Sequence, residues 1–135
     1  FKEYIEKLDK LEFEKMYEND FFRTWEKTRD ELEAVFTVAD TLRYLRENNI
    51  STKIFDSGLG ISLFRDNSTR TRFSFASACN LLGLEVQDLD EGKSQISHGE
   101  TVRETANMIS FMADIIGIRD DMYIGKGKAY IHEVS

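Results

Sequence analysis

The chain has 135 residues, of which 41% are hydrophobic and 12% aromatic, and its formal net charge is −7. This composition supports one packed core and excludes a disordered chain. The acidic balance argues against a general nucleic-acid-binding protein, which would need a basic face. Proline is absent and no repeat marks an internal boundary, so we expect a single domain over 1–135.

A cytoplasmic location is the simplest interpretation, because the only cysteine, Cys79, cannot form an internal disulfide. No apolar stretch approaches the roughly 20 residues of a membrane span, and the charged start has no signal-peptide core. The chain opens on Phe1 without methionine and closes on Ser135 within what reads as the start of a helix. We therefore expect a piece of a longer protein with no membrane partner.

Two helices are predicted before the first strand. Apolar residues recur at near-helical spacing over about 2–17 among many charges, which predicts an amphipathic helix. Thr28 to Glu31 then form a capping box, and an apolar stripe behind it predicts a helix down to Asn48.

A strand, a helix and a second strand follow within about 30 residues, as in a βαβ unit. The first strand is expected near 61–64, the helix over about 69–82 with Gly83 as its stop, and the second strand over 85–89. The crossover should be right-handed and the strands parallel.

The same pattern then repeats. A capping box over 97–100 predicts another helix, and 114–118 reads as a short buried strand. Three parallel strands alternating with helices predict an α/β fold, a three-layer sandwich with a parallel sheet. Ligands of such sheets bind outside the carboxyl ends of the strands, where three polar segments fall: 68–72, 93–98 and Arg119.

The segment Ser68-Thr69-Arg70-Thr71-Arg72 is the strongest candidate site. Backbone N–H groups in a first helical turn lack partners and carry positive charge, so added hydroxyls and guanidiniums make an anion site. The alternative is an ordinary helix start, with Ser68 as N-cap and both arginines in solvent. Five consecutive polar residues exceed what capping needs, and phosphate suits so many donors.

The other two candidates carry less information by themselves. The segment 93–98 alone reads as a surface loop, although Lys93, Gln95 and His98 could reach a ligand, and His98 could act as an acid or base. Arg119 could equally pair with a neighbouring aspartate or contact a ligand.

Several other site types are disfavoured. The glycine pairs fit neither a dinucleotide-binding nor a Walker pattern, the cysteine and histidines lack metal-ligand spacing, and no Ser, His and Asp set is placed for acyl transfer. We predict no metal and no cofactor.

Three motifs resemble the aspartate/ornithine carbamoyltransferase family over about 21–129. Residues 64–75 resemble its carbamoyl-phosphate motif, Ser-Thr-Arg-Thr-Arg before an aromatic-rich helix, and Ile118-Arg119 matches its strand-end arginine. Residues 94–100 resemble the ornithine-type loop Ser-Gln-Ile-Gly-His-x-Glu, with Ser97 in place of glycine. The Ser97-His98 pair, where aspartate-type enzymes carry lysines, and the segment 120–128 indicate a divergent branch, similar to transcarbamylases of unassigned acceptor.

The resemblance implies a role for each matching residue. Ser68, Thr69, Arg70 and Thr71 would hold the phosphate of carbamoyl phosphate, and Thr71 would also lie near the carbonyl oxygen. Arg119 would bridge phosphate and carbonyl, and Arg72 would brace the loop. Gln95, with Ser94 and His98, would serve the active site of a neighbouring subunit, since family members share sites across a trimer interface. Arg70, Thr71 and Arg119 would be the catalytic residues.

The resemblance also implies that this chain is the carbamoyl-phosphate-binding part of a two-domain carbamoyltransferase. Its small-molecule partners would be carbamoyl phosphate and an amino-acid-like amine, and it would form a homotrimer or a multiple of trimers. The acceptor domain would lie beyond Ser135, so we expect the isolated chain to be inactive. Two alternatives stay open: a catalytically silent module that binds carbamoyl phosphate or another anion, and a generic phosphosugar or nucleotide domain.

Overall fold

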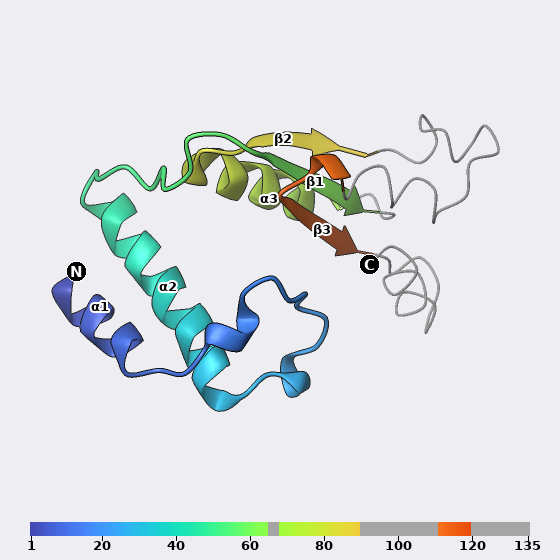
Figure 1. Cartoon of the computed structure of the whole chain (residues 1–135). Helices are drawn as coiled ribbons and strands as arrows, with labels where there is room; N and C mark the ends of the chain where they lie inside the picture. Colours follow the sequence, from blue (N-terminus) through green and yellow to red (C-terminus); the bar gives the residue numbers. More distant parts are fainter. Residues whose placement is uncertain (65–67, 90–110, 120–135) are drawn as a thin grey trace. The chain divides into compact units, whose positions relative to one another are not determined.

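The computed structural model describes residues 1–64, 68–89 and 111–119 (Figure 1). The chain divides into two compact units, Phe1–Thr52 and Lys53–Ser135. The helix predicted to follow the capping box at 97–100 lies outside the described residues. In the part of the chain that the structure describes, no helix has the length and apolar character needed to cross a membrane.

The N-terminal helix is shorter than the sequence predicts. Helix α1 spans Lys2–Asp9, so the expected continuation to about residue 17 is wrong. The backbone N–H of Glu12 donates to the Asp30 carboxylate at 3.1 Å instead of continuing a helical ladder. A single 3-10 turn, Glu14–Met16, follows. The apolar spacing here therefore serves two short pieces rather than one helix.

Helix α2, Arg29–Glu47, begins at the predicted capping box and follows a second 3-10 turn, Thr24–Glu26. The Thr28 hydroxyl accepts from the backbone N–H of Glu31 at 3.1 Å, and the Glu31 carboxylate accepts from the N–H of Thr28 at 2.8 Å. At the other end, Asn49 adopts a left-handed φ of 57°, and the N–H of Ile50 donates to the carbonyl of Leu45 at 2.9 Å. This is a Schellman ending.

Within the first unit, α1 packs on α2. The rings of Tyr4 and Tyr44 lie 5.9 Å apart between centroids, and Lys7 pairs with Glu33 at 3.5 Å. The two helices thus join through an aromatic contact and a surface ion pair.

The second unit contains the predicted parallel sheet. Strands β1 (Leu59–Phe64), β2 (Glu85–Asp88) and β3 (Ile115–Arg119) pair in the order β2-β1-β3, with β1 in the centre (Figure 1). All residues of β1 after Leu59 are buried, as expected for a central parallel strand. The α/β class with a parallel sheet is confirmed.

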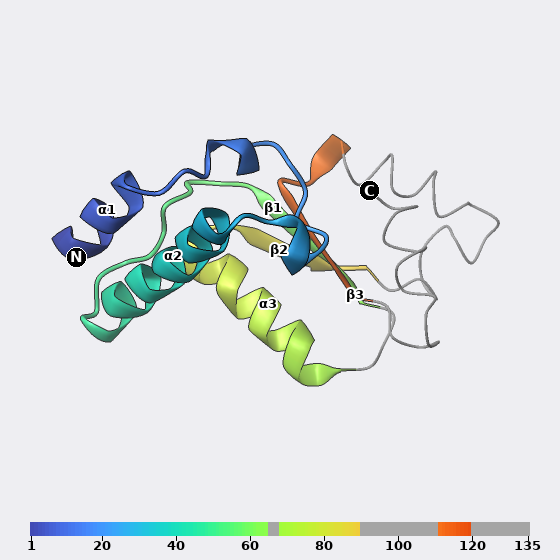
Figure 2. The ribbon, with the colours of Figure 1, turned by 90° about the horizontal axis from the view of Figure 1, so that it is seen from below.

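Helix α3, Thr69–Leu82, crosses from β1 to β2 and packs against both (Figure 2). It ends at Gly83, whose φ of 99° is left-handed. A Cβ at Gly83 would lie 2.0 Å from the carbonyl oxygen of Phe55, so the position requires glycine on two grounds.

An aromatic ring of α3 lies directly over β3. A Cβ built on Gly117 would lie 2.7 Å from Cε2 of Phe75, and the Phe75 ring meets that of Phe64 edge-on at 5.7 Å. The helix can approach the strand this closely because residue 117 has no side chain.

Candidate functional site

The register of the sheet gathers polar groups at its carboxyl edge. Phe64 at the end of β1 lies opposite Arg119 of β3, and Ser62 lies opposite Asp88 of β2. The predicted segment 68–72 opens α3 beyond the end of β1. Ser94, Gln95 and His98 lie outside the described residues, so the site is built here from its other members.

The first turn of α3 contains no acidic residue. Ser68 is the N-cap, but its Oγ lies 3.5 Å from the N–H of Thr71, at the limit of a hydrogen bond. Thr69 and Arg70 are exposed, and within the described ranges the Arg70 side chain has no hydrogen bond or ion pair. The helix therefore presents N–H groups and a cation to an anion.

A chain of hydrogen bonds joins this turn to the third strand. Nη1 of Arg119 donates to Oγ1 of Thr71 at 2.5 Å, and Oγ1 of Thr71 lies 3.0 Å from Oγ of Ser68. The guanidinium has no acceptor, so it must donate to Thr71, and either of the two hydroxyls can donate to the other. The structure thus brings together three of the predicted site residues.

The side chain of Arg72 contacts β1 and β2. Its Nη1 donates to Oδ2 of Asp88 and its Nη2 donates to the carbonyl oxygen of Phe64 at 2.9 Å. Oδ1 of the same aspartate accepts from Oγ of Ser62 at 2.6 Å. This agrees with the bracing role that the resemblance implies for Arg72.

Sequence reasoning missed Asp88 and Ser62. The only available signal was a buried hydroxyl in an otherwise apolar strand, since Ser62 is 3% exposed. Buried hydroxyls take hydrogen-bond partners, and the parallel register supplies Asp88. That register is a property of the folded sheet and cannot be read from residues 26 positions apart.

Taken together, these groups form an anion-binding edge. The guanidiniums of Arg119 and Arg72 both reach the first turn of α3, where Arg70 is exposed, and Asp88 neutralises Arg72. Hydroxyls and helix N–H groups complete a donor set suited to an oxyanion such as phosphate.

No other described region competes for this role. Burial raises the pKa of the Cys79 thiol, which stays protonated on the inner side of α3. Among the described residues there is no group of three or more metal-ligating side chains, and the expected absence of a metal stays a prediction.

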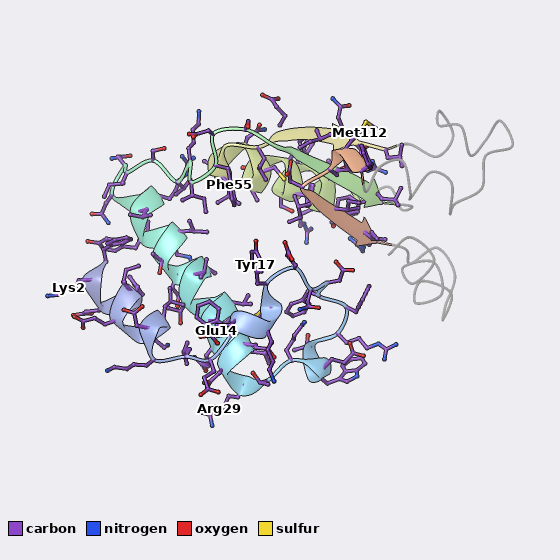
Figure 3. The ribbon with its side chains drawn as sticks, viewed as in Figure 1. Lys2, Glu14, Tyr17, Arg29, Phe55 and Met112 are labelled. Carbon is purple, nitrogen blue, oxygen red and sulfur yellow. The ribbon has the colours of Figure 1, made fainter. Side chains whose placement is uncertain are left out.

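A separate hollow of about 450 Å³ lies in the first unit and contains none of the predicted site residues. It is formed by the segment that carries Glu14 and Tyr17, labelled in Figure 3, and by α2. Its lining is nearly all apolar: Phe13, Met16, Tyr17, Ala34, Val35 and Val38. Glu14 is the only charged residue of its lining, so it offers few polar groups for orienting a reacting molecule.

The profile of the family described as "Aspartate/ornithine carbamoyltransferase, carbamoyl-P binding domain" matches residues 19–135. The protein named "Putative carbamoyltransferase YgeW" of Escherichia coli K12 is 73% identical over 119 residues, which are 88% of this chain and 30% of that protein. This chain therefore spans about a third of the length of the curated relatives it matches.

Relatives of both major types match to a similar degree. An aspartate carbamoyltransferase catalytic subunit of Saccharophagus degradans is 36% identical, covering 67% of this chain and 27% of that subunit. An ornithine carbamoyltransferase of Prochlorococcus marinus is 34% identical, covering 73% of this chain and 31% of that enzyme. Sequence identity therefore does not separate the two types.

A solved structure shares the fold. The catalytic subunit of M. jannaschii aspartate transcarbamoylase superposes with a TM-score of 0.71 at 26% identity, covering 85% of this chain and 38% of that subunit.

Proposed function

Because this chain belongs to the aspartate/ornithine carbamoyltransferase family, we propose that the full-length protein transfers the carbamoyl group of carbamoyl phosphate to an amine of an amino-acid-like acceptor. The described residues would hold the donor. One observation carries the proposal: the hydrogen-bonded chain from Arg119 through Thr71 to Ser68, at a helix N-terminus that has no acidic residue.

Each group has a place in this proposal. Ser68, Thr69, Arg70 and the first N–H groups of α3 would bind the phosphate, where the exposed Arg70 adds a full positive charge. Arg119 and Thr71 would lie at the carbonyl oxygen, because their hydrogen bond places a guanidinium and a hydroxyl beside the same point.

The chemistry needs preorganised donors. A neutral amine attacks the carbonyl carbon, and negative charge builds on the carbonyl oxygen. The bond between the carbonyl carbon and the phosphate oxygen then breaks, and the phosphate leaves with the proton that the amine nitrogen gives up. Donors at the carbonyl would stabilise the developing oxyanion, and donors at the phosphate would stabilise the leaving group. Arg119, Thr71 and Ser68 are already joined by hydrogen bonds, which supports a role as preorganised donors that would need little reorganisation.

The assembly forms a further part of the proposal. We propose a homotrimer or a multiple of trimers, in which Gln95, with Ser94 and His98, contributes to the site of an adjacent subunit. Sedimentation of the full-length protein tests this, and a purely monomeric protein would contradict the shared site. A cytoplasmic location is also proposed, supported by the single free cysteine, Cys79.

Donor binding tests the phosphate assignment. In the full-length protein, Arg70→Ala should abolish carbamoyl-phosphate binding that calorimetry can detect. The matched control is Arg43→Ala, which removes an equally charged arginine that is exposed on α2 and pairs with Asp40 at 3.8 Å. Equal affinity in the wild type and Arg70→Ala would contradict the assignment of Arg70.

Turnover requires a second assay. Full-length protein with carbamoyl phosphate and a panel of amino-acid amines should yield a ureido product. Tight carbamoyl-phosphate binding without any product would instead favour the silent anion-binding module. If sugar phosphates or nucleotides outcompete carbamoyl phosphate, the generic phosphate-domain alternative is favoured.

A further inference from the structure

We propose that Asp88 is a positioning residue of the anion site: it holds Arg72 as a strut between β1 and α3 and keeps that guanidinium away from the ligand. The proposed function supplies only the identity of the ligand, carbamoyl phosphate. The strut itself rests on contacts between described residues.

The contacts form a closed path across three elements. The path leaves β1 at Ser62, whose Oγ donates to Oδ1 of Asp88 at 2.6 Å. Oδ2 of Asp88 accepts from Nη1 of Arg72. The path returns to β1 when Nη2 of Arg72 donates to the carbonyl oxygen of Phe64 at 2.9 Å. Both carboxylate oxygens are therefore engaged, and β1 is tied to β2 and to the first turn of α3.

The position of this path explains why it would matter for binding. Arg72 directly follows Thr71, and its own N–H donates to the Ser68 carbonyl at 3.2 Å. Holding the Arg72 side chain therefore fixes the turn that carries the hydroxyls of the anion site.

The charge of Asp88 has a second effect, of opposite sign. A carboxylate near an anion site weakens anion binding through space, so removing it should tighten binding if charge alone matters. Removing the strut should weaken binding, because the turn loses its order. The sign of the change in affinity therefore separates the two roles.

The experiment uses Asp88→Asn in the full-length protein, with Glu85→Gln as the control. Glu85 is exposed on the same strand, and the control removes the same charge without touching Arg72. The ion pair is partly exposed, 28% for Arg72 and 43% for Asp88, so we expect a modest loss of about three- to tenfold in carbamoyl-phosphate affinity. Glu85→Gln should leave the affinity unchanged or slightly tighter.

Two further measurements test whether Asp88 acts through Arg72 and through the order of the first turn of α3. In an Arg72→Gln background, Asp88→Asn should change the affinity by less than about twofold, because Asp88 acts through Arg72. Amide hydrogen exchange of a peptide spanning 68–75, followed by mass spectrometry without ligand, should be at least about threefold faster in Asp88→Asn than in the wild type or Glu85→Gln.

The outcomes distinguish this inference from the proposed function. Wild-type exchange in Asp88→Asn overturns the strut, as does any gain in affinity in that variant. If the wild type does not bind carbamoyl phosphate, the proposed function fails, and faster exchange in Asp88→Asn alone still supports the strut.

Discussion

The N-termini of α2 and α3 differ in how the unpaired N–H groups and positive charge of the first turn are neutralised. Helix α2 has a complete capping box and two acidic residues in its first turn, Asp30 and Glu31. Helix α3 has a serine cap at 3.5 Å and no acidic residue, and its first turn carries Arg70 instead. One end is neutralised by its own sequence, and the other is left positive.

At a helix N-terminus, a carboxylate of the chain and an external anion compete for the same unpaired N–H groups. Carboxylates near an N-terminus stabilise a helix by up to about 1 kcal/mol at the surface. Helix α2 has this stabilisation, and α3, which has no carboxylate in its first turn, lacks it. A site for an external anion needs that positive end unoccupied. Single substitutions at the two N-caps therefore test this comparison.

The largest effect is expected from giving α3 an acidic cap. Ser68→Asp should retain capping, since aspartate is as good an N-cap as serine, but a fixed carboxylate about 4 Å from the ligand should lower carbamoyl-phosphate affinity about a thousandfold. Calorimetry and thermal melting of the full-length protein measure both properties. Thr28→Asp, the same exchange on α2, should leave the affinity unchanged; equal losses in the two variants would refute the comparison.

A smaller effect is expected from the hydroxyl that joins α3 to β3. Thr71→Val keeps the shape but removes the acceptor of Arg119, and should weaken carbamoyl-phosphate binding about ten- to hundredfold. Thr71→Ser should retain most of the affinity. On α2, Thr41 donates to the Thr37 carbonyl at 2.7 Å, and Thr41→Val should change only stability. Titration calorimetry on all three variants makes the comparison.

Removing the α2 cap should affect stability alone. Thr28→Ala deletes the hydroxyl that accepts from Glu31, and should lower the free energy of unfolding by about 1 kcal/mol in urea titrations followed by circular dichroism. Affinity for carbamoyl phosphate should not change. A loss of affinity would mean that the α2 cap also supports the anion site.

The smallest effect is a dependence on pH that belongs to α2. The backbone hydrogen bond from Thr28 lowers the pKa of Glu31, aided by the Thr28 hydroxyl and by the charges of Lys27 and Lys15, against an opposing effect of burial. The folded pKa lies below the unfolded one, so this stabilisation is complete above the unfolded pKa and is lost as pH falls through the folded pKa. Thermal melting from pH 6 to 3 should show a shallower acid loss for Glu31→Gln, which keeps a capping-box side chain without titrating. Parallel acid profiles would contradict the assignment.

Local signals predicted most of the architecture. The capping box at Thr28 and the left-handed stop at Gly83 each place a helix boundary through chemistry within a few residues, and both appear as predicted. The strands near 61–64, 85–89 and 114–118 are also confirmed within a residue or two at their ends. Their parallel pairing followed from the alternation of strands with predicted helices, and both pairs are parallel.

Long-range contacts account for what the sequence could not predict. Beyond the early end of α1, the N–H of Glu12 donates to the carboxylate of Asp30, 18 residues away. The partnership of Arg72 with Asp88 depends on a register that forms only in the folded sheet. The residue types over 68–72 indicated that this segment could bind an anion. The structure was needed to show that one of its arginines, Arg72, is already paired with Asp88.

Gly117 has a consequence for the anion site although it is not one of the residues of that site. Phe75 lies one helical turn beyond Thr71, and Gly117 lies two residues before Arg119, so each pair shares one face of its own element. The ring resting on the bare backbone thus acts as a spacer that sets how far apart the two walls of the site stand. A methyl group at residue 117 would widen that gap from beneath, so a position that no ligand touches constrains which ligands fit.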